Sequence, residues 1–395
     1  MTTLMQCSEQ WMKRPADERF LDLPSMKETA DKSRQNSVES VVTNRKIQFT
    51  PHPANPTRGL TIEGANGFID PTHYSFGQLA SLVGAPASYL RKLPAALAAD
   101  ALNYGMKFHR DVQEIGVLRT VEDVQVASPG ELFDGEAPAG SATERHSLGA
   151  REHVQLRAAT GPNYGRVWNN DIIGMLMDKF GDGRTGDFRV PGEFGKQVAI
   201  TKDNTTLYGS DRDMFIFLAD EENRVDVNNR RGGKAGSLAR GFFVWNSEVG
   251  SQSLGAAFFL FDYACSNRIV WGAQEFKEIR LRHSSGAPDR WLENIAPVLK
   301  EYSNAAAAPV EATIKAAQEA RVDDDLHKFL KERKFTNAQI NGAKEAHLRE
   351  EGRPIETLWD TVTGVTAYAK TIKNQDDRVG VERQGGKLLD LAADW

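Results

Sequence analysis

The sequence predicts an α+β protein with a central antiparallel sheet, and three observations support this fold class. Between residues 151 and 287, short apolar runs of strand length are separated by glycine, proline and aspartate. Residues 75–108 carry leucine at near-helical spacing, and the chain after Pro288 is rich in alanine, glutamate and lysine. Because turn residues interrupt the strand-like runs this regularly, an antiparallel sheet is favoured over βαβ repeats.

Composition limits the classes of function. The chain has 395 residues, of which 40% are hydrophobic and 26% are charged, so it can bury a substantial core. Its formal net charge of −5 excludes a globally basic coat for nucleic acid but allows a local basic groove. The two cysteines, Cys7 and Cys265, lie far apart and match no zinc spacing, which is typical of a reducing cytoplasm. We therefore expect a cytoplasmic protein without metal, cofactor or membrane partner.

Changes in composition divide the chain into five segments. Residues 1–48 are polar and mixed in charge, which predicts an N-terminal arm. Residues 49–127 form a predicted helical block that ends in a strand or hairpin, and 128–150, rich in Pro, Gly, Ser and Ala, form a flexible loop or linker. Residues 151–287 form the antiparallel sheet core with inserted helices, and 288–395 form a helical C-terminal region.

Capping signals place several helix ends. Gly84, Pro86 and Pro94 are expected to separate helices within the helical block. A helix over NNDIIGMLMDKF should begin at Asn169 or Asn170 as N-cap and end at Gly181. In the C-terminal region we expect helices near 289–304, 309–334, 336–350 and 355–373, with helix starts favoured by Asp323–Asp325 and Thr336.

The densest apolar runs lie between Arg230 and His283. The segments GFFVWNSE, LGAAFFLFDYA and FKEIRLRHS predict three successive strands. In the last of these, Ile279 and Leu281 should face one side of the sheet while Arg280 and Arg282 face the other.

The basic residues around this region are the main functional signal. Five cations stand against Asp226 within 224–240, a local net charge of +4, and glycines surround them; the cations are Arg224, Arg230, Arg231, Lys234 and Arg240. A flexible, basic, glycine-rich loop at a sheet edge suits contact with phosphates, and Arg280 and Arg282 extend the candidate nucleic-acid-binding set. A mobile loop above an ordinary core fits the pattern equally well. For the nearby Phe242, Trp245 and Trp271, a place in the core is favoured over stacking on bases.

Catalytic signals are weaker. Asp262, Glu275 and Lys277 resemble the acid and E-x-K arrangement of Mg²⁺-dependent nucleases, in which two acids hold the metal. A solvated strand face explains the same residues more simply, because E-x-K is common by chance. The scattered histidines, without HxH or HExxH, predict no metal site.

Several motifs resemble the DUF932 family, also called phage/plasmid-like proteins. The similarity is carried by Asn246–Gly250, Cys265-Ser266-Asn267 and the strand that ends in Arg282-His283. Two upstream blocks also resemble the family, 156–173 through Arg157, Tyr164 and Asn169, and 76–94 through its helices. At Asn267-Arg268 the chain departs from the Asn-Gly more usual in the family. The resemblance covers roughly 70–380 and implies an origin in a phage or plasmid, and thus a bacterial host cell, but no mechanism.

The leading functional hypothesis is a non-catalytic nucleic-acid-binding protein, with DNA as partner, acting on single strands in recombination or replication. Two alternatives stay open. One is a protein-interaction module that binds a host or phage protein, such as a host-factor antagonist; the other is the Mg²⁺-dependent nuclease. A homo-oligomer is compatible with each hypothesis.

Overall fold

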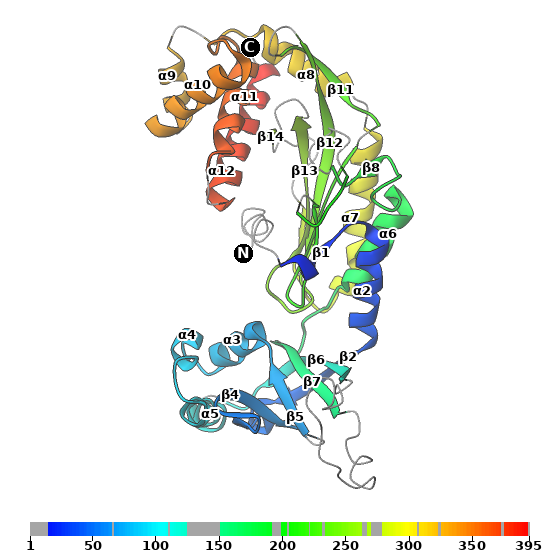
Figure 1. Cartoon of the computed structure of the whole chain (residues 1–395), viewed down its shortest axis with the longest axis vertical. Coiled ribbons are helices and arrows are strands. Elements are labelled where there is room, and N and C mark those ends of the chain that lie inside the picture. Colours follow the sequence, from blue (N-terminus) through cyan, green and yellow to red (C-terminus); the bar gives the residue numbers. More distant parts are fainter. Residues whose placement is uncertain are drawn as a thin grey trace, which may run out of the picture. The chain divides into compact units, whose positions relative to one another are not determined.

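The protein is an α+β protein, as the sequence predicts, and a computed structural model divides it into two units (Figure 1). Unit 1 comprises Met1–Ala30 and Gly165–Trp395, and unit 2 comprises Asp31–Tyr164. The structure describes residues 15–64, 67–109, 111–124, 151–191, 199–203, 205–220, 222–230, 234–262, 267–269, 279–305, 308–322, 325–372 and 375–393.

Unit 2 is built on a six-stranded sheet, of which the sequence indicated the strand at the end of 49–127 but not the sheet as a whole. Its strands are β2 (Ser37–Thr43), β3 (Phe49–His52), β4 (Asn55–Gly64), β5 (Gly67–Pro71), β6 (Glu114–Val124) and β7 (Arg151–Thr160). Their order is β2-β6-β7-β5-β4-β3, and all neighbours are antiparallel except the parallel pair β5–β7. Pro51 lies in the edge strand β3, where a missing N–H is tolerated.

One face of this sheet is covered by the predicted helical block. The helices are α3 (His73–Leu82), α4 (Ala87–Leu90) and α5 (Ala95–Tyr104), followed by a π turn, η3 (Gly105–His109); a short turn, η2 (Asn44–Lys46), lies earlier in the chain. Leu79 and Leu102 from the helices share a buried cluster with Phe49 and Ile115 from the strands. The predicted breaks are confirmed, because Gly84 has a left-handed φ of 72° and the next two helices begin directly after Pro86 and Pro94.

The region predicted as an N-terminal arm is folded from residue 15 onward. It contains η1 (Ala16–Glu18), β1 (Arg19–Phe20), α2 (Leu23–Gln35) and then β2. Leu23 and Met26 are fully buried in the core of unit 1, and β1 pairs with a strand near residue 208. Two buried side chains three positions apart hold the start of α2 in place although the segment is polar overall.

Unit 1 contains a nine-stranded sheet in which every pairing is antiparallel. Besides β1, its strands are β8 (Phe188–Arg189), β9 (Leu207–Gly209), β10 (Met214–Asp220), β11 (Val225–Arg230), β12 (Lys234–Asn246), β13 (Leu254–Asp262), β14 (Asn267–Ile269) and β15 (Ile279–Leu281). The main order is β1-β9-β10-β12-β13-β14, while β8 pairs with β10, β11 with β12, and β15 with β13. The three successive strands predicted from the apolar runs correspond to β12, β13 and the short β15.

Three helices cover one face of this sheet. They are the start of α2, α6 (Asn169–Phe180) and α7 (Ala287–Asn304), and Figure 1 shows them along the same side of the strands. Leu176 of α6 and Leu299 of α7 pack with Phe242 and Val244 of β12 in one buried cluster. The other face carries a second buried cluster that includes Phe217, Trp245 and Phe259. The strands are therefore buried on both sides, which explains their nearly continuous apolar sequence.

The C-terminal region is helical, as predicted. Its elements are α8 (Ala308–Glu319), α9 (Leu326–Glu332), α10 (Asn337–Glu351), α11 (Leu358–Ala369), α12 (Gln375–Gly386) and η5 (Lys387–Ala393). Thr336 caps α10 in a capping box with Gln339, which confirms its predicted role. The single helix expected over 309–334 is instead two, because Asp325 accepts a hydrogen bond from Lys328 N and starts α9.

Glycines in β12 and β13 make room for aromatic rings across the ladder. Gly255 pairs with Trp245, and Gly241 pairs with Phe259. A Cβ atom on Gly255 would lie 2.2 Å from Cζ2 of Trp245, and one on Gly241 would lie 2.2 Å from Cζ of Phe259. Each ring therefore occupies the space that a side chain on the opposite strand would need.

We predict that Gly255→Ala lowers the free energy of unfolding by about 1–3 kcal/mol, because the new methyl group displaces the buried Trp245 ring. The matched control is Gly174→Ala in α6, where the nearest atom to the new Cβ is Lys27 Cε at 3.5 Å. This control should keep or raise stability, since alanine favours a helix by about 0.5–1 kcal/mol. Urea unfolding followed by tryptophan fluorescence measures both, and equal stability of the two variants would contradict the prediction.

Candidate functional site

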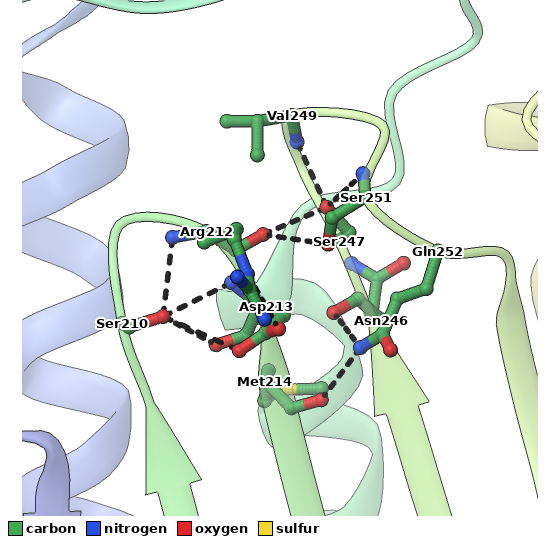
Figure 2. Close-up of polar contacts among 9 residues, drawn as sticks. All are labelled: Ser210, Arg212, Asp213, Met214, Asn246, Ser247, Val249, Ser251 and Gln252. Carbon is green, nitrogen blue, oxygen red and sulfur yellow. Dashed lines mark hydrogen bonds and ion pairs between the residues drawn. The ribbon is translucent and has the colours of Figure 1, made fainter. Parts of the chain in front are cut away.

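The residues of the family resemblance form a hydrogen-bonded turn between β12 and β13. Figure 2 shows Ser247 donating to the backbone carbonyl of Arg212 at 2.7 Å, while its hydroxyl oxygen accepts from Ser251 N at 3.0 Å. Gln252 Nε2 donates to the carbonyl of Asn246 at 3.0 Å. These side chains satisfy backbone groups of the turn and of the neighbouring β9–β10 loop, so their first role is to fix its shape.

The β9–β10 loop has a matching internal network. Ser210 Oγ accepts from the backbone N–H groups of Arg212 and Asp213, each at 3.1 Å, and Figure 2 shows these contacts beside the turn. The Asp213 side chain is buried and accepts from Arg212 Nε at 3.2 Å. Asp213 thus ends the turn directly before β10.

Two residues of the turn also hold the start of α6. Asn246 Nδ2 donates to Val167 O and to Asn169 Oδ1, both at 2.8 Å, and Asn169 N donates to Glu248 Oε1 at 2.8 Å. The N-cap residue of α6 is Trp168, whose side chain makes no capping bond. Glu248 supplies the missing acceptor, and its negative charge is favourable at a helix N-terminus.

The N-cap of α6, expected at Asn169 or Asn170, therefore lies one or two residues earlier, at Trp168. Asn169 is the first residue of the helix, and the capping oxygen comes from a residue 79 positions later in the chain. No local pattern can reveal an acceptor that tertiary structure brings from another strand. The predicted stop at Gly181 is confirmed by its φ of 83°.

A second contact is made by His283, two residues after the end of β15. His283 Nδ1 lies 3.0 Å from Gly165 O, and Gly165 N donates back to His283 O at 3.4 Å. A Cβ atom on Gly165 would lie 1.8 Å from Ser284 O, so only glycine allows this approach. Burial lowers the pKa of His283, the bond to Gly165 opposes this effect and the charge of Arg166 adds to it, and together they bring the pKa from 6.5 to about 4. His283 is therefore neutral at pH 7.

These contacts define a buried polar junction with no evident catalytic arrangement. Asn246, Glu248 and His283 are each less than a tenth exposed, and their described bonds go to backbone groups or to Asn169. Within the ranges that the structure describes, no group of three His, Cys, Asp or Glu residues could hold a metal ion. The junction can orient α6 and β15 on the sheet. The exposed cations lie outside it.

The predicted basic loop is largely a β-hairpin. Val225 pairs with Leu238 and Arg230 with Lys234, so β11 and β12 leave only residues 231–233 between them. Arg224 precedes β11 and is exposed. Arg231 and the side chains of Arg230 and Lys234 lie outside the described residues. Alternating Val225, Val227 and Leu238 are buried against the C-terminal helices, which explains why this stretch forms strands.

Arg240 does not belong to the exposed set. Its side chain is buried, and its guanidinium lies 3.7 Å from the buried carboxylate of Asp220. It also donates to the carbonyl oxygens of Tyr302 and Ala305 at the end of α7. A cation at a helix C-terminus satisfies carbonyls that lack partners within the helix. The guanidinium is thus occupied inside unit 1 and does not face solvent for a phosphate.

Arg280 and Arg282 occupy the predicted positions. Both are exposed, while Ile279 and Leu281 pack against the main cluster of unit 1. The strand β15 pairs with one end of β13, with Arg280 opposite Gly255. The predicted alternation is therefore confirmed, and the two arginines lie on the side of β15 away from that cluster.

The structure separates the two groups of cations. Gly255, the partner of Arg280, pairs on its other side with Trp245, which stands eleven positions after Lys234 in β12. At about 3.3 Å per residue, the tip of the hairpin lies about 36 Å along the strand from β15. The cations that the sequence grouped together therefore form two separate groups on one sheet.

The structure describes only some of the remaining candidate site residues. Asp262 ends β13, with its backbone opposite Leu238 and Asn267. Its side chain, together with Glu275, Lys277, Cys265 and Trp271, lies outside the described residues, so the nuclease arrangement stays a prediction. Phe242 and Trp245 are fully buried, which confirms their favoured place in the core.

The turn between β12 and β13 lies in a part of unit 1 that is similar to a known family. The model of the DUF932 family, described as a domain of unknown function, matches residues 196–386. This match spans just under half of the chain, includes the motif at Asn246–Gly250, and supports the resemblance to the DUF932 family. Comparisons with curated proteins and with solved structures gave no match. No helix within the described part of the chain is long and apolar enough to span a membrane.

We predict that Asn246→Asp destabilises unit 1 by about 2–4 kcal/mol. The substitution replaces a buried donor by an acceptor that faces Val167 O and Asn169 Oδ1. Asn294→Asp on the exposed side of α7 makes the same chemical change and should cost less than about 0.5 kcal/mol. Denaturant unfolding of both variants checks this, and equal losses would show that the junction is not needed for stability.

We also predict that His283 makes stability depend on pH. Because its folded pKa of about 4 lies below its ordinary value of 6.5, only the unfolded chain takes up this proton between these pH values. The contribution of His283 to the free energy of unfolding is thus fully present above pH 6.5. It falls by about 3 kcal/mol as the pH drops to 4. In His283→Asn, which keeps an N–H for Gly165 O, this part of the pH dependence should disappear. Urea unfolding of both proteins from pH 4 to 7 tests it, and parallel curves would refute it.

Proposed function

We propose that this protein binds nucleic acid without catalysing its cleavage. The observation that carries the proposal is the segment 279–282, in which Arg280 of β15 and the following Arg282 are exposed while Ile279 and Leu281 pack against the core. Arginine side chains fixed on a rigid strand lose less entropy on binding than those on a mobile loop. Their planar guanidinium groups match phosphate oxygens in two-point hydrogen bonds.

The charge around β15 supports an anionic partner. Residues 279–290 contain Arg280, Arg282 and Arg290 against Asp289 alone, a local net charge of +2 in a chain of net −5. His283 adds nothing to this charge at neutral pH because burial lowers its pKa to about 4. Arg290 is also exposed, and it donates to Ser284 Oγ at 3.2 Å. Three exposed arginines in one short segment favour contact with phosphates over a neutral ligand.

The hairpin β11–β12 offers a second place of contact. Arg224 is exposed at its base, and the backbone positions of Arg230 and Lys234 lie opposite each other at its end. Because the hairpin end and β15 are about 36 Å apart along the strand, one nucleic acid reaches both groups only if it is long enough. An oligonucleotide long enough to contact both groups should therefore bind more tightly than its added length alone explains.

The biological setting of this proposal comes from the family resemblance. We place the protein in the recombination or replication of phage or plasmid DNA in a bacterial cytoplasm, with single-stranded DNA as the preferred partner. Single strands are favoured because a flexible backbone can follow two separated groups of cations more easily than a stiff duplex. A host or phage protein as the partner is the alternative that the same experiment distinguishes.

We predict that the full-length protein binds fluorescein-labelled single-stranded DNA and that affinity falls steeply with salt. Arg280→Glu/Arg282→Glu should weaken binding at least tenfold and reduce the slope of log K against log salt by about 1.4, or about 0.7 per lost phosphate contact. The control Lys344→Glu/Arg349→Glu makes the same change in charge at exposed positions of α10 and should bind nearly as the unchanged protein does. Fluorescence anisotropy measures all three proteins, also with duplex DNA and with shorter strands.

Two results would contradict the proposal. Absence of binding to either form of DNA at low salt would refute nucleic-acid binding altogether. Equal losses in the β15 and α10 variants would show that only net charge matters, and would remove β15 as the binding surface.

A further inference from the structure

Unit 2 carries an apolar stripe on the solvent side of α5 and the π turn η3. Leu97 is 56% exposed, Tyr104 is 64% exposed and Phe108 is 73% exposed. Ala101 lies between the first two and is also exposed. The opposite side of the same helix is buried in the core of unit 2 through Leu102 and its neighbours. A helix that is apolar on both sides covers the core with one and needs a partner for the other.

The spacing of the stripe is that of a helix–helix contact. Leu97, Ala101, Tyr104 and Phe108 are separated by four, three and four residues, the alternation that keeps side chains on one seam between two packed helices. The ring centroids of Tyr104 and Phe108 are 5.4 Å apart, so Phe108 continues the stripe across the π turn.

The π turn is held in place from within unit 2. Asn44 Nδ2 donates to Met106 O at 3.2 Å, and Arg45 donates to the same oxygen at 2.8 Å. A Cβ atom on Gly105 would lie 2.5 Å from Cβ of Val83, so the turn packs directly on the chain after α3. Phe108 is thus presented on a fixed piece of backbone, and π turns of this kind recur at functional positions.

We propose that this stripe is the interface of a homodimer in which two copies of α5 pack antiparallel. In that arrangement Leu97 of one copy meets Phe108 of the second copy, and Ala101 meets Tyr104 of the second copy. Each layer then joins a smaller side chain to a larger aromatic one, which fills the space between the helices evenly. The surface is complementary to itself, as a twofold interface requires.

The flanking charges select the same arrangement. Asp100 and Lys107 are exposed and stand seven residues, or about two turns, apart, so they lie on the same side of the stripe. In the antiparallel dimer, Asp100 of each copy faces Lys107 of the other. In a parallel twofold dimer, Asp100 and Lys107 of the second copy would lie on the opposite edge of the interface, so these opposite charges would not pair. Opposite charges at the two ends of a self-complementary stripe argue for a second copy over an unrelated partner.

The size of the stripe sets the expected strength. Its few side chains offer less than the roughly 800 Å² per partner that is typical of stable complexes. The dimer should therefore be weak and should form with rising protein concentration. This inference goes beyond the proposed nucleic-acid binding and is independent of it.

The first test is sedimentation velocity of the full chain without nucleic acid, over an about hundredfold range of concentration. The unchanged protein should shift from monomer to dimer, and Tyr104→Glu should stay monomeric throughout. The control Leu292→Glu introduces the same charge at a leucine on α7 that is 48% exposed. This variant should dimerise as the unchanged protein does. A monomer at every concentration, or a dimer that Tyr104→Glu leaves intact, would overturn the proposal.

The second test exchanges the flanking charges. Asp100→Lys alone and Lys107→Asp alone should each weaken dimerisation at least threefold, because like charges then face each other across the interface. The double variant Asp100→Lys/Lys107→Asp should restore it, since the pairs return with reversed sign. Circular dichroism checks that each variant is folded. Single variants that dimerise normally, or a double variant no better than the singles, would exclude the antiparallel arrangement.

Discussion

The architecture of unit 1 depends on the long ladder between β12 and β13, which is buried on both faces. Such a ladder must fit large rings into limited space, and the pairs Trp245–Gly255 and Gly241–Phe259 solve this by placing each ring over a residue without a side chain. The ladder then fixes the turn at its end, because Asn246 is the last residue of β12. From that turn, Asn246 and Glu248 hold the start of α6, so the core packing also determines where the helices lie.

Much of this fold could be predicted from the sequence, and the failures have physical causes. Helix boundaries such as Gly181 and Thr336 were predictable because their signals are local. Most of the sheet of unit 2 was not, because proline is unusual in a strand and Pro51 is tolerated only since β3 lies at the sheet edge. The cap of α6 was not predictable either, because its acceptor comes from Glu248 across the fold.

The candidate site shows the same division between local and long-range information. The alternation around Arg280 and Arg282 is a property of one short segment and was predictable. The role of Arg240 was not, because its partners Asp220 and Tyr302 are distant in the chain. Sequence proximity grouped Arg240 with Arg224, but tertiary structure buries one and exposes the other. The residues of the DUF932 motif serve mainly to build the junction, and the cations next to it carry the proposed binding.

The pairing of β1 with β9 has a consequence for how the chain acquires its structure. Arg19 lies opposite Tyr208, so the whole of unit 2 is inserted between the first strand of unit 1 and its partner. During synthesis, unit 2 can fold as soon as its own residues have emerged from the ribosome. Arg19 and Phe20 must wait without their partner strand until the chain as far as residue 208 is made. Completion of unit 1 is therefore a late, long-range closure, which is expected to be its slow step.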